Sequence, residues 1–130
     1  MKWLLAMVLT LLLLSALAGA GNSGADCSIN SVGVLPTSAT ADHSALPPGN
    51  SLQFFAVGGV PKGCVSIPAI LTDVTWSVSD TVKVTISNAQ GQTSGTATCI
   101  AATGGPVTVT ATRPAVNGHS LSGTSTLTCK

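Results

Sequence analysis

Charged residues are scarce in this chain of 130 residues: they make up 7% of it, and glutamate and tyrosine are absent. Beyond residue 20 the cations are Lys62, Lys83, Arg113 and Lys130, and the anions are Asp26, Asp42, Asp73 and Asp80. A protein that binds nucleic acid needs a basic face to neutralise phosphates. Four scattered cations cannot form one, so the composition excludes nucleic acid as a partner, and an anionic membrane surface for the same reason.

Motifs that carry catalysis are also missing. The sequence has no Gly-x-Ser-x-Gly elbow, no phosphate loop, no dinucleotide fingerprint and no Cys-x-x-Cys pair that could start a zinc site. Asp42, His43 and Ser44 are the residue types of a hydrolase triad, but consecutive residues cannot converge on one another. Both His43 and His119 fall in expected loops, where a solvated histidine is the simpler interpretation. We expect no catalytic residue, no metal, no cofactor and no enzymatic activity.

The N-terminal residues have the order of a secretory signal peptide. Lys2 supplies a positive start, residues 3–14 are almost entirely apolar, and residues 16–18 (ALA) offer a small-residue cleavage site. The apolar run barely reaches the length of a spanning helix, about 20 residues, and no basic cluster follows it. A lipoprotein signal is not expected, because Ala20 stands where the lipidated cysteine would be. We expect residues 1–20 to be removed and the mature protein to be secreted, periplasmic or at the cell surface, without membrane insertion.

The remaining sequence favours β-strands. Helical periodicity is absent, and short runs of alternating apolar and polar residues are separated by Gly, Pro, Asn and Asp. Seven strands are predicted, around residues 32–39, 52–56, 74–78, 82–86, 96–101, 107–111 and 121–129. Seven short strands at this spacing are typical of an antiparallel β-sandwich. The prediction is an all-β domain over residues 31–130, preceded by an N-terminal segment, residues 21–30.

The alternation also predicts which side chains form the core. The inward-facing positions include Phe54, Trp76, Val107 and Val109. Phe55 must then point outward or toward a sheet edge. Two interpretations stay open: Phe55 is covered by the segment around Cys64, or it is an exposed anchor for a partner.

Four stretches resemble the bacterial immunoglobulin-like domains of group 2. They are residues 48–54 (PGNSLQF), 74–80 (VTWSVSD), 95–98 (GTAT) and 107–112 (VTVTAT), of which the second is the most specific. The resemblance implies a seven-strand Ig-like β-sandwich with Greek-key connections, found in exported bacterial proteins, adhesins among them. The family carries no common active site. Its members commonly lack cysteine, whereas this chain has four.

Export places these four cysteines in an oxidising compartment, where disulfides are expected. Cys27, Cys64, Cys99 and Cys129 allow three pairings. Successive strands of a sandwich alternate in direction, which puts Cys27 and Cys64 at one pole and Cys99 and Cys129 toward the other. The bridges Cys27–Cys64 and Cys99–Cys129 are therefore predicted, because either alternative would join opposite ends of the domain.

The function expected is a non-enzymatic module for binding or structural support at the bacterial cell surface or envelope. Its partner would be a protein or an envelope carbohydrate, recognised through residues 59–71 and 113–120, two stretches expected to be loops at the same pole. Phe55, Asn117 and His119 are the individual candidates for contact with it. The alternative is a self-assembling structural protein, because uncharged edge strands invite strand addition between copies.

Overall fold

The residues that the structure describes form strands and turns, with no helix among them. The computed structural model describes residues 27–65, 69–116 and 118–130. Its strands are β1 (Ser31–Leu35), β2 (Ser38–Ala41), β3 (Ser51–Gln53), β4 (Phe55–Gly59), β5 (Ala69–Ile70), β6 (Thr75–Val78), β7 (Val84–Ile86), β8 (Thr96–Cys99), β9 (Val107–Val116) and β10 (His119–Cys129). The all-β class is confirmed. The expected signal peptide, residues 1–20, lies outside the described residues, and within these residues there is no helix long and apolar enough to span a membrane.

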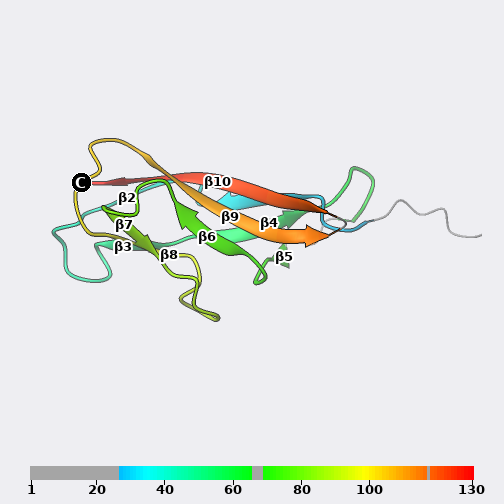
Figure 1. The fold of residues 1–130 in the computed structure, drawn as a ribbon, viewed down its shortest axis with the longest axis horizontal. Helices are drawn as coiled ribbons and strands as arrows, with labels where there is room; N and C mark the ends of the chain where they lie inside the picture. Colours follow the sequence, from blue (N-terminus) through cyan, green and yellow to red (C-terminus); the bar gives the residue numbers. More distant parts are fainter. Residues whose placement is uncertain (1–26, 66–68, 117) are drawn as a thin grey trace, which may run out of the picture.

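The strands form one larger and two smaller sheets in a sandwich-like arrangement (Figure 1). The larger sheet has the order β2-β10-β9-β6, and the smaller ones have the orders β1-β4-β5 and β3-β8-β7. Only Phe54 separates β3 from β4, so the two smaller sheets adjoin along the chain. All pairings are antiparallel except that of β2 with β10. Because β1 packs against β9 and β10, the smaller sheets lie over the larger one.

The first predicted strand, residues 32–39, is in fact two strands in different sheets. β1 pairs with β4, whereas β2 runs parallel to the end of β10. Between them stands Pro36, which has no N–H to donate to a ladder and restricts the residue before it. Its carbonyl oxygen instead accepts a hydrogen bond from the Ser125 hydroxyl, at 2.5 Å. The chain thus crosses from one layer to the other at the proline.

The number of strands is also higher than predicted at two further places. The run at residues 52–56 is divided at Phe54, whose N–H donates to the carbonyl of Gly95 (2.9 Å). A short extra strand, β5, pairs with β4 inside the stretch expected to be a loop.

The strand predicted at residues 82–86 begins two residues later than expected, because the Asp80 carboxylate accepts hydrogen bonds from the N–H groups of Val82 and Lys83, both at 3.1 Å. Local side-chain bonds here compete with the ladder.

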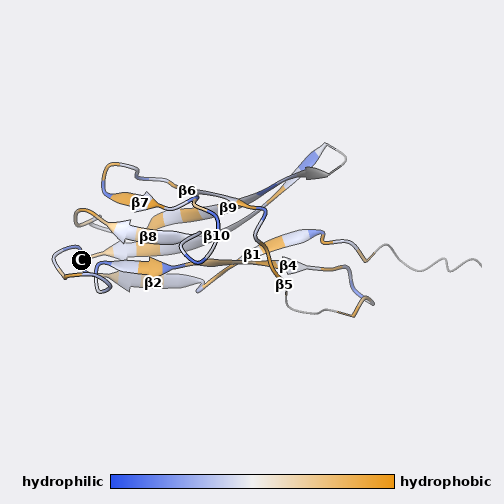
Figure 2. Cartoon of the chain, turned by 90° about the horizontal axis from the view of Figure 1, so that it is seen from below, coloured by the Kyte–Doolittle hydropathy of each residue, from blue (hydrophilic) through white to orange (hydrophobic). Residues whose placement is uncertain are grey.

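The predicted core residues are buried between the layers. Phe54 and Val109 have no exposed surface, and Trp76 and Val107 are 4% and 7% exposed. The alternation that predicted them is visible along the strands as orange segments between paler ones (Figure 2). Leu127, which is also fully buried, brings the last strand into the same cluster. These four core predictions are confirmed.

At Gly123 the two layers approach each other closely. A Cβ atom at this position of β10 would lie 2.3 Å from the carbonyl oxygen and 2.8 Å from the carbonyl carbon of Val32 in β1. Both atoms belong to the backbone, so no side-chain rotation could relieve the contact. Glycine is required here for close passage of β1 over β10.

We expect Gly123→Ala to lower the free energy of unfolding by about 1–3 kcal/mol, because the layers must separate to admit the methyl group. Gly105→Ala is the matched control, since a Cβ there meets nothing within 4 Å. Its effect should stay within about 0.5 kcal/mol. Urea unfolding of the two variants beside the parent chain measures both. Equal stability of the two variants would contradict the close crossing.

Two disulfides close the ends of the domain. Cys27 is bonded to Cys64 and Cys99 to Cys129, with Cα–Cα distances of 5.6 and 5.7 Å. These are the two pairs that the strand order predicted. The second bridge is buried, with both residues 2% exposed, and holds the C-terminal end of β10 to the end of β8. The first holds residues 27–30 against the loop that follows β4.

Candidate functional site

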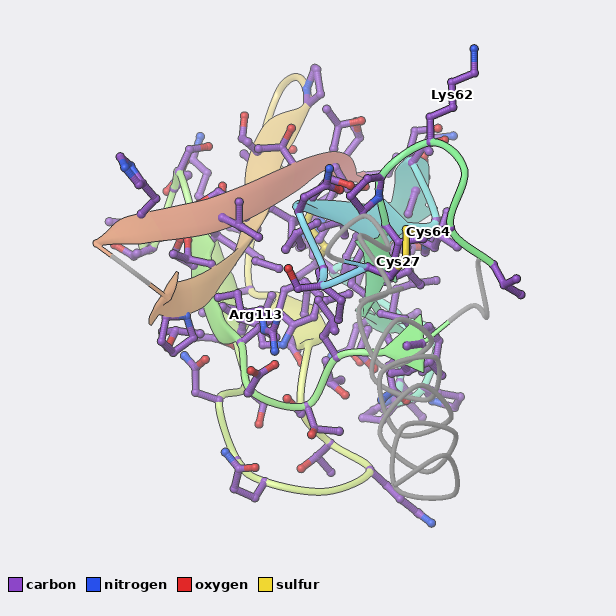
Figure 3. The ribbon with its side chains drawn as sticks, turned by 90° about the vertical axis from the view of Figure 1, so that its right-hand side faces the viewer. Cys27, Lys62, Cys64 and Arg113 are labelled. Carbon is purple, nitrogen blue, oxygen red and sulfur yellow. A yellow bond between two sulfur atoms is a disulfide. The ribbon has the colours of Figure 1, made fainter. Side chains whose placement is uncertain are left out.

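The two stretches predicted to form a recognition surface do lie at one end of the domain. Figure 3 looks onto this end, with Lys62 and the Cys27–Cys64 bridge on one side and Arg113 on the other. However, residues 113–120 are mostly strand rather than loop: β9 continues to Val116, and β10 starts at His119. The positive φ of Gly118 (85°) allows the tight turn between them. Pro114, which suggested a loop, lies near the register shift between His119 and Leu121.

A cavity of about 370 Å³ opens between this hairpin and the N-terminal segment. It is lined by Ser28, Ile29 and Asn30 on one side and by Arg113, Pro114, His119 and Leu121 on the other. We call it the hairpin groove. The N-terminal side of the groove is fixed by the Cys27–Cys64 bridge and by the Asn30 N–H, which donates to the carbonyl of Gly59 (2.9 Å). The groove therefore depends on the disulfide.

Of the described residues that line the groove, Arg113 is the one with a charged side chain. Its Nε donates to the Asp73 carboxylate at 2.7 Å, and the two side chains are 23% and 50% exposed. An exposed pair of this kind adds at most about 1 kcal/mol to stability. Its more important effect is to fix the direction of the guanidinium, whose terminal nitrogens make no hydrogen bond within the described part of the chain. A planar guanidinium held this way can donate to a carboxylate or a carbonyl of a ligand.

The structure places only one of the two hairpin residues predicted to contact a partner. His119 is exposed and lines the hairpin groove, whereas Asn117 lies outside the described residues. Arg113 was not among the residues predicted to contact a partner, although it is the only arginine of the chain and lies within the predicted stretch 113–120. Its rarity in a chain with so few charges could have marked it as a candidate contact residue.

Phe55 is 41% exposed, which favours the second of its two interpretations. A small cavity of about 100 Å³ beside it is not lined by Cys64. Its lining consists of residues 53–56, residues 70–72, Trp76, Gln90, Gly91 and Ser94. Leu35 is the cross-strand neighbour of Phe55, and Ile70 is that of Val57. These side chains give the outer face of the β1-β4-β5 sheet an uncharged, partly apolar surface.

The Asp42, His43 and Ser44 sequence forms a turn. The Asp42 carboxylate accepts from the hydroxyl and from the N–H of Ser44, at 2.7 and 2.9 Å. These hydrogen bonds hold the pKa of Asp42 below its ordinary value. His43 contacts the Lys130 carbonyl oxygen through Nδ1, so Asp42 and Ser44 bond each other and the imidazole is directed elsewhere.

Among the residues described, no group of His, Cys, Asp and Glu is placed to hold a metal ion. The titratable side chains are spread over turns and strand ends. Neither the cavity beside Phe55 nor the hairpin groove has a pair of carboxylates among its described lining residues. Comparison of the sequence with protein-family models and with curated proteins finds no match.

Proposed function

We propose that this chain is an exported Ig-like module without enzymatic activity. The sheet orders support the Ig-like assignment when β3 and β4 are taken as one bent strand. The smaller sheets then have the order β1, β3/β4, β8, β7, and the larger one contains β10, β9, β6. These correspond to the ABED and GFC sheets of an immunoglobulin constant-type domain, with β2 and β5 as additional short strands. The core position of Trp76 on β6 fits strand C of that fold.

Export to the envelope or the cell surface is supported by two independent features. The first is the signal-peptide pattern of residues 1–20. The second is the pair of disulfides, which use all four cysteines and form readily only in an oxidising compartment. The mature chain would act after secretion, in the periplasm or at the cell surface.

Binding is the activity that the site supports best, and the hairpin groove carries this proposal. It combines an apolar side chain on each side, Ile29 and Leu121, with one oriented guanidinium and the exposed His119. Ligand sites are commonly concave and apolar with a few placed polar groups. The partner we propose is an envelope protein or carbohydrate that presents an acceptor to Arg113. Nucleic acid is not a candidate, and no cofactor is required.

Arg113→Ala is expected to weaken binding of the envelope partner by about tenfold or more, because a charge-assisted hydrogen bond would be lost. The partner is first identified by photo-crosslinking from position 119 in envelope extract and then purified for titration. Lys83→Ala removes the same charge far from the groove, next to β7, and should leave the affinity unchanged. If both variants bind as tightly as the parent, the groove is not the binding site.

Self-assembly is the second candidate function, and the edge strand β2 favours it. β2 consists of four uncharged residues at the border of the larger sheet, and among the residues described one of its edges has no strand neighbour. Edge strands of this kind pair readily with another chain. Light scattering after size exclusion distinguishes the candidates: a monomer at all concentrations contradicts assembly.

A further inference from the structure

The hairpin groove places one positive charge directly beside an apolar side chain. Arg113 in β9 and Leu121 in β10 lie opposite each other in the antiparallel register. The Cβ atoms of such a pair are about 4.5–5.5 Å apart, on the same face of the sheet. Ile29 lines the groove from the N-terminal segment, so the guanidinium and two apolar side chains border a single concave surface.

The charge of this surface is complementary to an anion. Its described lining includes Arg113 but neither aspartate nor glutamate. Asp73, which is outside this lining, accepts from Nε at 2.7 Å and so positions the guanidinium. The two terminal nitrogens make no hydrogen bond within the described residues. Together they form a planar pair of donors that can hold both oxygens of one carboxylate.

The short distance from the charge to the apolar side chain favours a chain end over an internal acidic residue. In an extended segment, neighbouring side chains point to opposite sides, and side chains two positions apart are separated by about 6.5–7 Å. Neither arrangement matches the cross-strand spacing of Arg113 and Leu121. A C-terminal residue matches it, because its carboxylate and its side chain leave the same Cα atom.

Size and lining also favour a peptide over an acidic sugar. The groove volume of about 370 Å³ is near the lower end of the range for small-molecule sites, about 300–1,000 Å³, and suits one or two residues. Its described lining has no Phe, Tyr or Trp on which a sugar ring could stack. The exposed Asn30 adds a side-chain amide that can donate to or accept from a peptide backbone.

We infer that the hairpin groove binds the free C-terminus of a partner protein whose last residue is apolar. This inference rests on the proposed binding function of the groove and names its ligand. The α-carboxylate of the last residue accepts hydrogen bonds from the terminal nitrogens of Arg113. The side chain of the same residue packs between Ile29 and Leu121.

The test titrates the purified exported chain with short peptides and follows binding by NMR. The probes are acetyl-Gly-Ser-Leu with a free C-terminus, the same peptide with a C-terminal amide, and acetyl-Gly-Ser-Ser with a free C-terminus. Amidation should weaken binding about 10- to 100-fold, because hydrogen bonds to a charged group are lost. Replacement of the terminal leucine by serine should weaken it about tenfold, because an apolar side chain is no longer buried.

Two variants assign the effect to Arg113. Arg113→Lys keeps the charge but loses the planar pair of donors, so the preference for the free over the amidated peptide should fall several-fold. Lys62→Ala is the control, because Lys62 lies at the same end of the domain but does not line the groove (Figure 3). It should leave the affinity for each peptide unchanged.

The inference is overturned if the amidated peptide binds as tightly as the free one. It is equally overturned if glucuronate, or an amidated peptide with an internal aspartate, binds as tightly as the peptide that ends in leucine. If the envelope partner crosslinked from position 119 still depends on Arg113 in that case, the groove remains the binding site and only its ligand class is wrong. If neither the peptide nor the envelope partner depends on Arg113, the proposed function fails as well.

Discussion

Phe54→Ala is expected to lower the free energy of unfolding by about 3–5 kcal/mol, whereas Phe55→Ala costs less than about 1 kcal/mol. The two phenylalanines are adjacent in sequence, but Phe54 is fully buried between the layers and Phe55 is 41% exposed. Removing the ring of Phe54 leaves a cavity where β3 meets β4, and the strands around it are fixed by the ladders to β1 and β8. They can close only part of that cavity.

Unfolding in guanidinium chloride, followed by tryptophan fluorescence, measures this difference. Trp76 is the only tryptophan after residue 20, so its emission reports on the core alone. Each variant serves as the control of the other, because the two changes are chemically identical. Comparable losses in both variants would mean that Phe55 is packed as tightly as Phe54, and would contradict an accessible Phe55 surface.

Removal of the Cys99–Cys129 bridge by alanine at both positions should cost about 4–5 kcal/mol. The loop that it closes separates residues 30 positions apart, which corresponds to about 3.5–4 kcal/mol in the chain-entropy model. Loss of two buried sulfur atoms adds about 1 kcal/mol. The Cys27–Cys64 bridge spans 37 positions and has nearly the same entropic effect, but Cys27 is exposed and Cys64 only half-buried. Its removal should therefore cost about 1 kcal/mol less.

Equilibrium unfolding of the two double-alanine variants tests this order of stability. The Cys27→Ala, Cys64→Ala variant should also lose affinity for an envelope partner, because the N-terminal wall of the hairpin groove then loses its covalent tie to the loop after β4. The Cys99→Ala, Cys129→Ala variant should keep that affinity while folded. A larger loss of stability on removal of the Cys27–Cys64 bridge would show that burial of the Cys99–Cys129 bridge does not make it the more stabilising of the two.

Local pattern was sufficient to predict the elements that depend on a period of two. The alternation around Trp76 and around Val107 and Val109 predicted both the strands and the inward side chains, because a strand with one buried face can satisfy only one register. The disulfide pairing followed from the same information, since strand direction alone decides which cysteines share an end. For Phe55 the sequence left two interpretations, and the 41% exposure of its side chain favours the second.

Only the tertiary structure determines which residues that are far apart in the sequence lie close together. The sequence predicted one strand over residues 32–39, whereas the chain breaks at Pro36, where β1 ends its pairing with β4 and β2 runs parallel to β10. Arg113 and Ile29 line the same groove because the Cys27–Cys64 bridge, between residues 37 positions apart, and the Asn30 hydrogen bond to Gly59 hold the N-terminal segment in place. Asn88 lies beyond the predicted strand at residues 82–86, and its side-chain amide exchanges two hydrogen bonds with the Trp76 backbone because one sheet packs beside the other. Sequence periodicity determines which face of a strand is buried, whereas the neighbours of its edges are set by the three-dimensional path of the chain.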